Sequence, residues 1–173
     1  ERYRIRQLIK RLKNKRSFNQ STSLITIYIP PGTQLSDIVN KLREEYGTAS
    51  NIKDKNTGKA VQAAIQSIIA RMKLLRNTPT GLVIMCGQTE DDMEYYAIEP
   101  PEPIGIKQYV CDSYFHTEHL EELLEEKDAY GLIVIDRGGA TFAVVKGNHI
   151  EIVYDTDSFV PSKHRQGGQS AQR

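Results

Sequence analysis

The segment Leu24-Ile25-Thr26-Ile27-Tyr28-Ile29 is followed directly by Pro30-Pro31-Gly32. It is rich in β-branched residues and has isoleucine at every second position, which is typical of a strand with one side facing a core. Two prolines and a glycine do not continue a strand, so we expect it to end at Ile29. The sequence on either side has the periodicity of helices, which predicts a sheet covered by helices.

The helix before this strand is predicted over residues 2–16. Its apolar residues recur at the spacing of one helical face: Ile5, Leu8, Ile9 and Leu12. The opposite face carries Lys and Arg side chains, which are typical of a solvated surface but can also hold phosphates.

Two more helices are predicted after the strand. Ser36 is a candidate N-cap for the first, which ends at Gly47, and Thr57 is a candidate N-cap for the second. Because the connection over residues 48–56 is short, we expect an antiparallel helical hairpin with a protruding tip. Ile52 is expected to be exposed at that tip.

Further strands are predicted at residues 81–86, 93–98 and 107–111, and an acidic helix at residues 117–127. Together these elements predict an N-terminal domain over residues 1–128, a mixed α/β sandwich of normal domain size.

Three short strands at residues 132–136, 141–145 and 150–154 then predict a small β meander. A single small sheet rarely folds alone. We therefore expect residues 129–173 to be the beginning of a second domain that is cut short here.

Charge is distributed unevenly along the chain. Residues 1–76 hold 16 Lys and Arg against 5 Asp and Glu, whereas residues 77–128 hold 2 against 13. The first part therefore predicts a basic surface for a polyanion such as nucleic acid. The alternative is that the charges of distant segments neutralise one another across the folded surface.

Several kinds of site are disfavoured. Cys86 and Cys111 are too few for a disulfide framework, and a lone cysteine in a strand is more often a core residue than a nucleophile. His116 and His119 have no evident third ligand, so we expect no metal site and no cofactor. No apolar run is long enough to span a bilayer and no secretion signal is evident, so we expect a cytoplasmic protein without a membrane partner.

The segment from Pro161 to Arg173 is polar and contains Gly167-Gly168-Gln169. As a bare string, this triplet is typical of a flexible linker. In a tight site, however, two glycines permit close approach of the backbone. A main-chain N–H or the glutamine amide can then position a water molecule or stabilise a developing oxyanion.

Three segments resemble a known family: Thr48-Ala49-Ser50-Asn51-Ile52-Lys53, Tyr109-Val110-Cys111-Asp112-Ser113-Tyr114-Phe115, and Lys163-His164-Arg165-Gln166-Gly167-Gly168-Gln169-Ser170-Ala171-Gln172-Arg173. The chain resembles the N-terminal domain and the start of the middle domain of a class 1 peptide-chain release factor of the archaeal and eukaryotic type. The similarity covers essentially the whole chain, with the motifs in the right order.

The resemblance implies that the hairpin tip and the Tyr109–Phe115 segment meet the stop codon of a messenger RNA in the ribosomal decoding site. The residues to which it gives this role are Thr22, Ser23, Glu45, Thr48, Ser50, Asn51, Ile52, Lys53, Asp54, Tyr109, Cys111 and Phe115. Single-stranded bases are recognised by stacking and by hydrogen bonds to their edges, which such side chains can supply. For Tyr109 and Phe115, core packing is the alternative.

The resemblance further implies that Gly167, Gly168 and Gln169 enter the peptidyl-transferase centre and help water attack the ester of peptidyl-tRNA. Ribosomal RNA supplies most of that site, so the protein is expected to be a trigger rather than an enzyme. A C-terminal part outside this sequence is expected to bind a translational GTPase. The alternative function is that of a ribosome-rescue or surveillance factor without codon-specific release, although the related rescue proteins lack Gly-Gly-Gln.

Two positions depart from the family pattern. Asp54 stands where the common motif has serine, and Ser21 stands where it has glycine. The negative charge of Asp54 beside RNA costs affinity unless it pairs with a neighbour such as Lys53 or Lys55. Both departures bear on whether all three stop codons are read equally.

Overall fold

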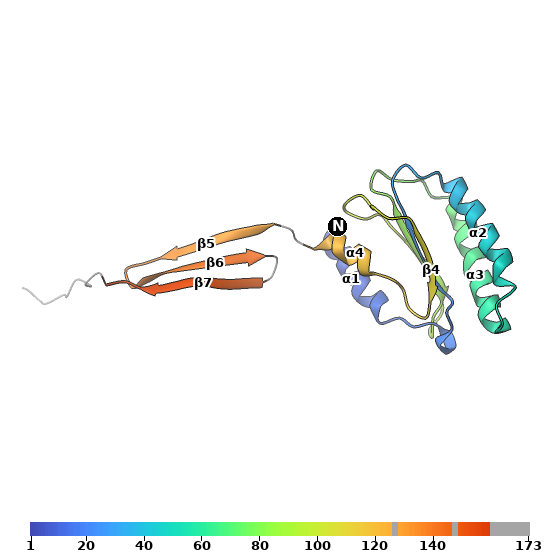
Figure 1. Ribbon diagram of the computed structural model, residues 1–173, viewed down its shortest axis with the longest axis horizontal. Helices are drawn as coiled ribbons and strands as arrows, with labels where there is room; N and C mark the ends of the chain where they lie inside the picture. Colours follow the sequence, from blue (N-terminus) through green and yellow to red (C-terminus); the bar gives the residue numbers. More distant parts are fainter. Residues whose placement is uncertain (126–127, 147–148, 160–173) are drawn as a thin grey trace, which may run out of the picture. The chain divides into compact units, whose positions relative to one another are not determined.

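The computed structural model describes residues 1–125, 128–146 and 149–159. The chain separates into two compact units, with the division after Glu125. Each unit contains a sheet of its own, with four strands in the first and three in the second (Figure 1).

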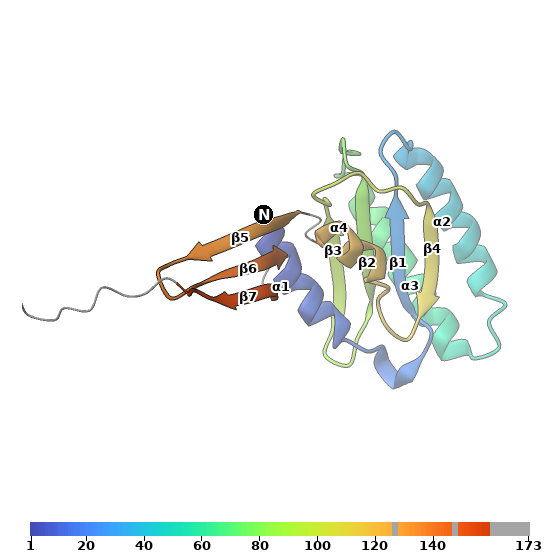
Figure 2. The same cartoon turned by 60° about the vertical axis from the view of Figure 1, so that its left-hand side comes forward.

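The sheet of the first unit is antiparallel. Its strands are β1 (Leu24–Ile29), β2 (Leu82–Gln88), β3 (Met93–Ile98) and β4 (Gln108–Asp112). They lie in the order β3-β2-β1-β4 (Figure 2). Because β1 pairs with β2 on one side and with β4 on the other, the first strand of the chain lies inside the sheet.

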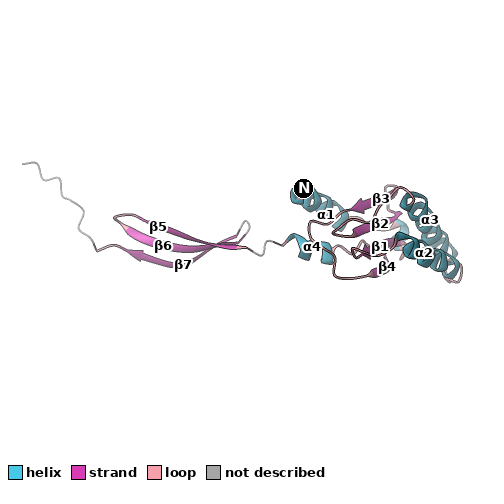
Figure 3. Ribbon diagram, turned by 90° about the horizontal axis from the view of Figure 1, so that it is seen from above, coloured by secondary structure: helices cyan, strands magenta, loops and turns pink. Residues whose placement is uncertain are grey.

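Helices cover both faces of this sheet (Figure 3). One face is covered by α2 (Leu35–Ala49) and α3 (Lys55–Met72), and the other by α1 (Arg2–Lys13) and α4 (Glu118–Leu124). Ile25, Ile27 and Ile29 of β1 belong to the core beneath α2 and α3, whereas Leu24 and Tyr28 belong to the core beneath α1 and α4. The predicted α/β sandwich, with three isoleucines on one side of the strand, is confirmed.

The helical hairpin is tighter than predicted. α2 passes through Gly47 and ends at Ala49, and the N-cap of α3 is Asp54 rather than Thr57. At the start of α2 the N-cap is Gln34, not Ser36. The connection between the helices is therefore residues 50–54, so Thr48 lies on α2 and not in the tip.

The tip is folded back onto α3, so the prediction that Ile52 is exposed is wrong. Ile52 is half-buried and packs against the core beneath α2 and α3. Gly58 makes this approach possible, since a Cβ at its position would lie 2.9 Å from the carbonyl oxygen of Ala49 and 3.6 Å from the Cβ of Ile52. The hairpin tip therefore has a fixed conformation rather than a loose one.

The second unit is the predicted meander. Strands β5 (Ala129–Ile135), β6 (Gly139–Lys146) and β7 (His149–Asp157) pair antiparallel in that order. Residues 147–148, between β6 and β7, lie outside the described residues. Large apolar side chains of β5 and β7 are exposed on this sheet, among them Ile133, Ile135 and Ile152.

Candidate functional site

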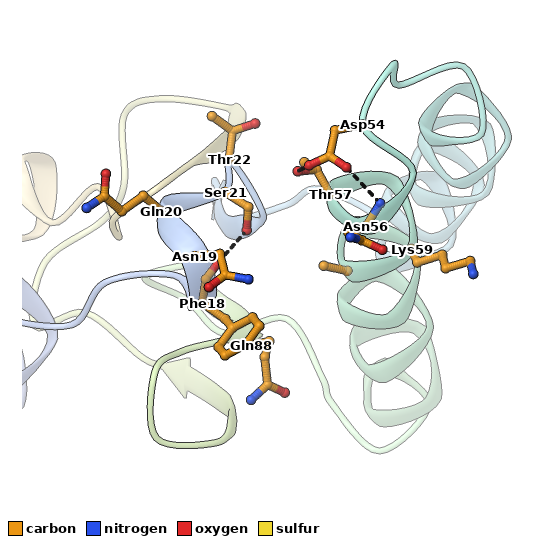
Figure 4. Close-up of a pocket in the computed structure, with 11 residues that line it drawn as sticks. Phe18, Asn19, Gln20, Ser21, Thr22, Asp54, Asn56, Thr57, Lys59 and Gln88 are labelled. Carbon is orange, nitrogen blue, oxygen red and sulfur yellow. Dashed lines mark hydrogen bonds between the residues drawn. The ribbon is translucent and has the colours of Figure 1, made fainter.

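A hollow of about 690 Å³ lies between the loop before β1 and the start of α3 (Figure 4). Ten labelled side chains line it, from three separate segments: Phe18, Asn19, Gln20, Ser21, Thr22, Asp54, Asn56, Thr57, Lys59 and Gln88. Most of these side chains are polar, and both donors and acceptors of hydrogen bonds are present. The side chains that line the hollow can therefore form hydrogen bonds with a polar ligand.

The loop on one side of the hollow has an unusual backbone. Asn19 and Gln20 both have a φ of 54°, in the left-handed region that non-glycine residues rarely adopt. The hydroxyl of Ser21 closes this turn, because it donates to the carbonyl oxygen of Phe18 at 2.9 Å. Ser21 itself has a φ of −68°, so the position tolerates a side chain where the family pattern has glycine. Backbone strain of this kind occurs most often at functional sites.

Asp54 stands on the other side and caps α3. Its carboxylate accepts hydrogen bonds from the backbone N–H of Asn56 at 3.0 Å and from the hydroxyl of Thr57 at 2.8 Å. The Thr57 hydroxyl, and then the Asn56 N–H, hold the pKa of Asp54 below its usual value, so the carboxylate is charged at neutral pH. The structure thus gives Asp54 a helix cap as its partner, in place of the predicted pairing with Lys53 or Lys55.

Exposed side chains surround the turn that precedes this cap. Asn51 and Lys53 are exposed, and the backbone N–H of Asn51 donates to the carbonyl oxygen of Thr48 at 3.0 Å. Ser50 and Thr48 are also exposed, and their hydroxyls donate to backbone carbonyls of α2. The turn therefore presents an amide and an ammonium group on a rigid backbone.

A second group of predicted residues gathers where α2 meets the edge strand β4. The thiol of Cys111 donates to the hydroxyl oxygen of Tyr109 at 3.3 Å, and both side chains are half-buried. Burial, and then the neighbouring Cys111, raise the pKa of Tyr109, and burial raises the pKa of Cys111. The negative charge of Glu45 raises both pKa values further. Glu45 also forms an ion pair with Lys41 at 3.1 Å.

Two of the predicted residues are buried. The ring of Phe115 is 2 % exposed and belongs to the core beneath α1 and α4, so it is not available for stacking on a base. For this residue the alternative of core packing holds. Ser23 is fully buried, and its hydroxyl lies 2.7 Å from that of Ser21. Ser23 therefore supports the loop beside the hollow through Ser21, whereas Phe115 belongs to the core.

Seven residues of the hollow were not singled out from the sequence: Phe18, Asn19, Gln20, Asn56, Lys59, Ala60 and Gln88. The first three belong to a polar run with one aromatic residue, and Phe18 is 53 % exposed. The signal that the sequence offered was one aromatic residue beside a run of polar residues. The sequence offered no such signal for Gln88, because only the folding of the sheet brings the end of β2 beside this loop.

Cysteine and metal chemistry find no support in the described part of the chain. Burial raises the pKa of the Cys86 thiol to about 11, and it raises that of Cys111 as well, so neither is a thiolate at neutral pH. Among the described residues, no three His, Cys, Asp or Glu side chains are placed to hold a metal ion.

The helices of the described ranges include none long and apolar enough to cross a membrane. Gly167, Gly168 and Gln169 lie outside the described residues.

Comparison with known proteins identifies the family to which the chain belongs. A family model described as eRF1 domain 1 matches residues 1–125, and one described as eRF1 domain 2 matches residues 129–173. The chain belongs to the eRF1 family. The predicted resemblance to release factors is thereby confirmed.

Curated eRF1 relatives with the name peptide chain release factor subunit 1 cover the chain completely. Those of Methanopyrus kandleri and Picrophilus torridus are each 51 % identical to it. A solved structure of an archaeal translation termination factor, aRF1, is 37 % identical and covers 93 % of the chain with a TM-score of 0.69. The chain spans 43 % of the two curated relatives and 46 % of the solved chain.

Proposed function

We propose that the chain is the codon-reading part of a translation termination factor, together with the segment that triggers release of the finished peptide. The first unit binds the stop codon in the hollow between the loop of residues 18–22 and the start of α3. The Gly167–Gln169 segment acts in the peptidyl-transferase centre. Messenger RNA, ribosomal RNA and peptidyl-tRNA are the partners.

The single observation that carries this proposal is the convergence of the 18–22 loop with the hairpin turn on one polar hollow. Of the residues that the family resemblance assigns to codon reading, Thr22 and Asp54 line this hollow, and Asn51 and Lys53 are exposed on the turn beside Asp54. An unpaired base needs a flat surface for stacking and polar groups for its edge. Phe18 supplies the first, and the amide and hydroxyl side chains of the hollow supply the second.

Glu45, Tyr109 and Cys111 extend the reading surface along α2 and β4. The carboxylate of Glu45 accepts hydrogen bonds, and amino groups on base edges donate them. Because burial keeps Tyr109 and Cys111 protonated, each can donate a hydrogen bond. We assign Ser23 a supporting role only, and we assign Phe115 no part in codon reading because its side chain lies in the core.

The Gly167-Gly168-Gln169 segment carries the release step in this proposal. Glycine permits close approach to the ester, and the glutamine amide or a backbone N–H positions the attacking water. The surrounding RNA does the rest, so the protein acts as a trigger and not as a self-sufficient enzyme. In the complete factor, the part beyond this sequence recruits a translational GTPase.

Peptide release from ribosomes programmed with stop or sense codons tests the proposal in the complete protein. Lys53→Gln is expected to weaken release on stop codons by at least about tenfold, since it removes a cation beside the hollow. Lys73→Gln, at the other end of α3, is the matched control and is expected to leave release unchanged. Gly168→Ala is expected to abolish release while ribosome binding remains.

Equal release on stop and sense codons would contradict codon reading. It would favour the alternative of a rescue or surveillance factor, which enters the decoding site without reading the codon. Full activity of Gly168→Ala would instead show that the Gly-Gly-Gln segment is a linker.

A further inference from the structure

The cations of α1 divide into two flanks with different surroundings. On the flank toward α4, Arg2 pairs with Glu102 at 2.8 Å, and Lys13 pairs with Glu121 at 2.8 Å. The guanidinium of Arg6 on this flank donates to the carbonyl oxygen of Leu124 at 2.9 Å. The acidic segment that follows residue 77 therefore neutralises this flank.

The other flank keeps its charge. Arg4, Lys10 and Arg11 are exposed, and within the described ranges none of them forms an ion pair. Arg4 and Arg11 are seven residues apart, which places them on the same side of the helix about 10 Å from each other. Tyr3 and Lys10 have the same spacing and stand beside them.

An aromatic ring and an amide side chain lie among these charged side chains on the helix surface. Tyr3 is 72 % exposed, and Gln7 is exposed between the two pairs. Arg4 and Arg11 also line a shallow hollow of about 620 Å³, together with Glu1 and Glu99. Those two carboxylates reduce the positive potential there but do not cancel three cations. A basic surface with an exposed ring suits a nucleic acid better than it suits an acidic peptide.

We propose that this outer face of α1, comprising Tyr3, Arg4, Gln7, Lys10 and Arg11, is a second RNA-binding surface. The three cations bind phosphates, and the ring of Tyr3 stacks on an unpaired base. Since α1 and the α2–α3 hairpin pack on opposite faces of the sheet, this surface is separate from the codon-reading hollow. It goes beyond the proposed function, because it needs no stop codon.

Salt-dependent binding of a labelled single-stranded RNA to the 173-residue chain tests this surface. The probe is about 12 nucleotides long, comparable to the site of one small RNA-binding fold, and contains no stop triplet. Each phosphate contact to a single strand contributes about 0.7 to the slope of log K against log salt. Arg4→Gln with Arg11→Gln is therefore expected to reduce that slope by about 1.4.

Arg2→Gln with Lys13→Gln is the matched control, because it removes the same charge from the neutralised flank of the same helix. It is expected to change the slope by less than about 0.5. Tyr3→Ala is expected to weaken binding at least about fivefold with the slope unchanged, whereas Tyr3→Phe retains affinity. Thermal melting of every variant checks that the fold is intact.

Equal losses in the two double variants would overturn the proposal and show that only net charge matters. No loss in Arg4→Gln with Arg11→Gln would overturn it too. Equal binding of the chain to poly-glutamate, measured in competition, would show that the face takes acidic polypeptides instead. Because neither ribosome nor stop codon is present, these outcomes are independent of the release assay.

Discussion

Asp54 has two effects that can be separated by substitution. It caps α3, and it places a negative charge at the hollow for which we propose RNA binding. Serine is also a good N-cap, so Asp54→Ser is expected to keep the melting temperature nearly unchanged. The loss of a charge that repels phosphate is expected to strengthen binding to stop-programmed ribosomes, measured at low and at high salt.

Asp54→Ala is the matched control, since it removes the charge and the cap together. Its melting temperature is expected to fall by a few degrees. If Asp54→Ser and Asp54→Ala melt alike, the cap does not stabilise the hairpin.

Asp112 links stability to pH. Its carboxylate accepts a hydrogen bond from the ring of His116 at 2.9 Å, and this contact, followed by the backbone N–H of Ser113, lowers its pKa. A depressed pKa in the folded state stabilises the fold above the unfolded value of about 3.9. That contribution is lost as the pH falls through the folded pKa.

Asp112→Asn is therefore expected to melt at a lower temperature than the native chain at pH 7. The two melting temperatures are expected to converge once the pH has fallen below the lowered folded-state pKa, where the carboxylate is protonated in both states. A difference that persists unchanged at that pH would show that the carboxylate's charge is not the cause.

The sequence did not show which of the candidate site residues are accessible for binding and which belong to the core. Tyr109 and Cys111 are two residues apart on β4. Because the side chains of a strand alternate between its two faces, these two lie on the same face. Phe115 does not follow them, because β4 ends at Asp112 and the loop returns the ring beneath the opposite face. Alternation along a strand gives no information about residues beyond its end.

At the scale of elements, two glycines in the hairpin have opposite consequences. Within a helix, alanine in place of glycine normally stabilises a protein by about 0.5–1 kcal/mol. For Gly47, nothing lies within 4 Å of the added Cβ, so Gly47→Ala is expected to stabilise by that amount. At Gly58 the same atom would lie 2.9 Å from the carbonyl oxygen of Ala49, so Gly58→Ala is expected to destabilise.

Urea unfolding of the two variants measures this difference directly. Gly58→Ala is also expected to weaken stop-codon reading, because it moves the turn that presents Asn51 and Lys53. Stabilisation by both substitutions would mean that the tip is not held against α3 as described.

The order and type of the elements could be predicted from the sequence, but the ends of the hairpin helices could not. Asp54 and Thr57 are both suitable caps, and local sequence does not choose between them. Gly47 normally favours a helix end, yet Leu42 and Ala49 are buried on the same helix, and this packing outweighs the low propensity of one glycine. Tertiary contacts thus set the length of the tip.

At the scale of the molecule, the two units differ in how well they bury apolar surface. Among the described residues, the buried members of both large cores of the first unit lie between Ile5 and Leu124. We therefore expect residues 1–125 to fold alone and to unfold in one cooperative transition. Amide NMR spectra of residues 1–125 and of the whole chain are expected to overlay for these residues.

The second unit leaves apolar side chains of β5 and β7 exposed, including Ile133, Ile135 and Ile152. By itself it is expected to lack cooperative melting and to bind a hydrophobic dye. A cooperative transition of isolated residues 126–173 would contradict this expectation.

In the proposed function, the hollow beside the hairpin tip holds a nucleotide of the stop codon. The most direct test places a photoreactive thiouridine at the first position of a stop codon in a ribosomal complex with the complete protein. Mass spectrometry then maps the crosslinked peptides. We expect crosslinks within residues 17–22 or 50–60, and we expect them to disappear when a sense codon replaces the stop codon. Crosslinks confined to α1 or to the second unit would contradict it.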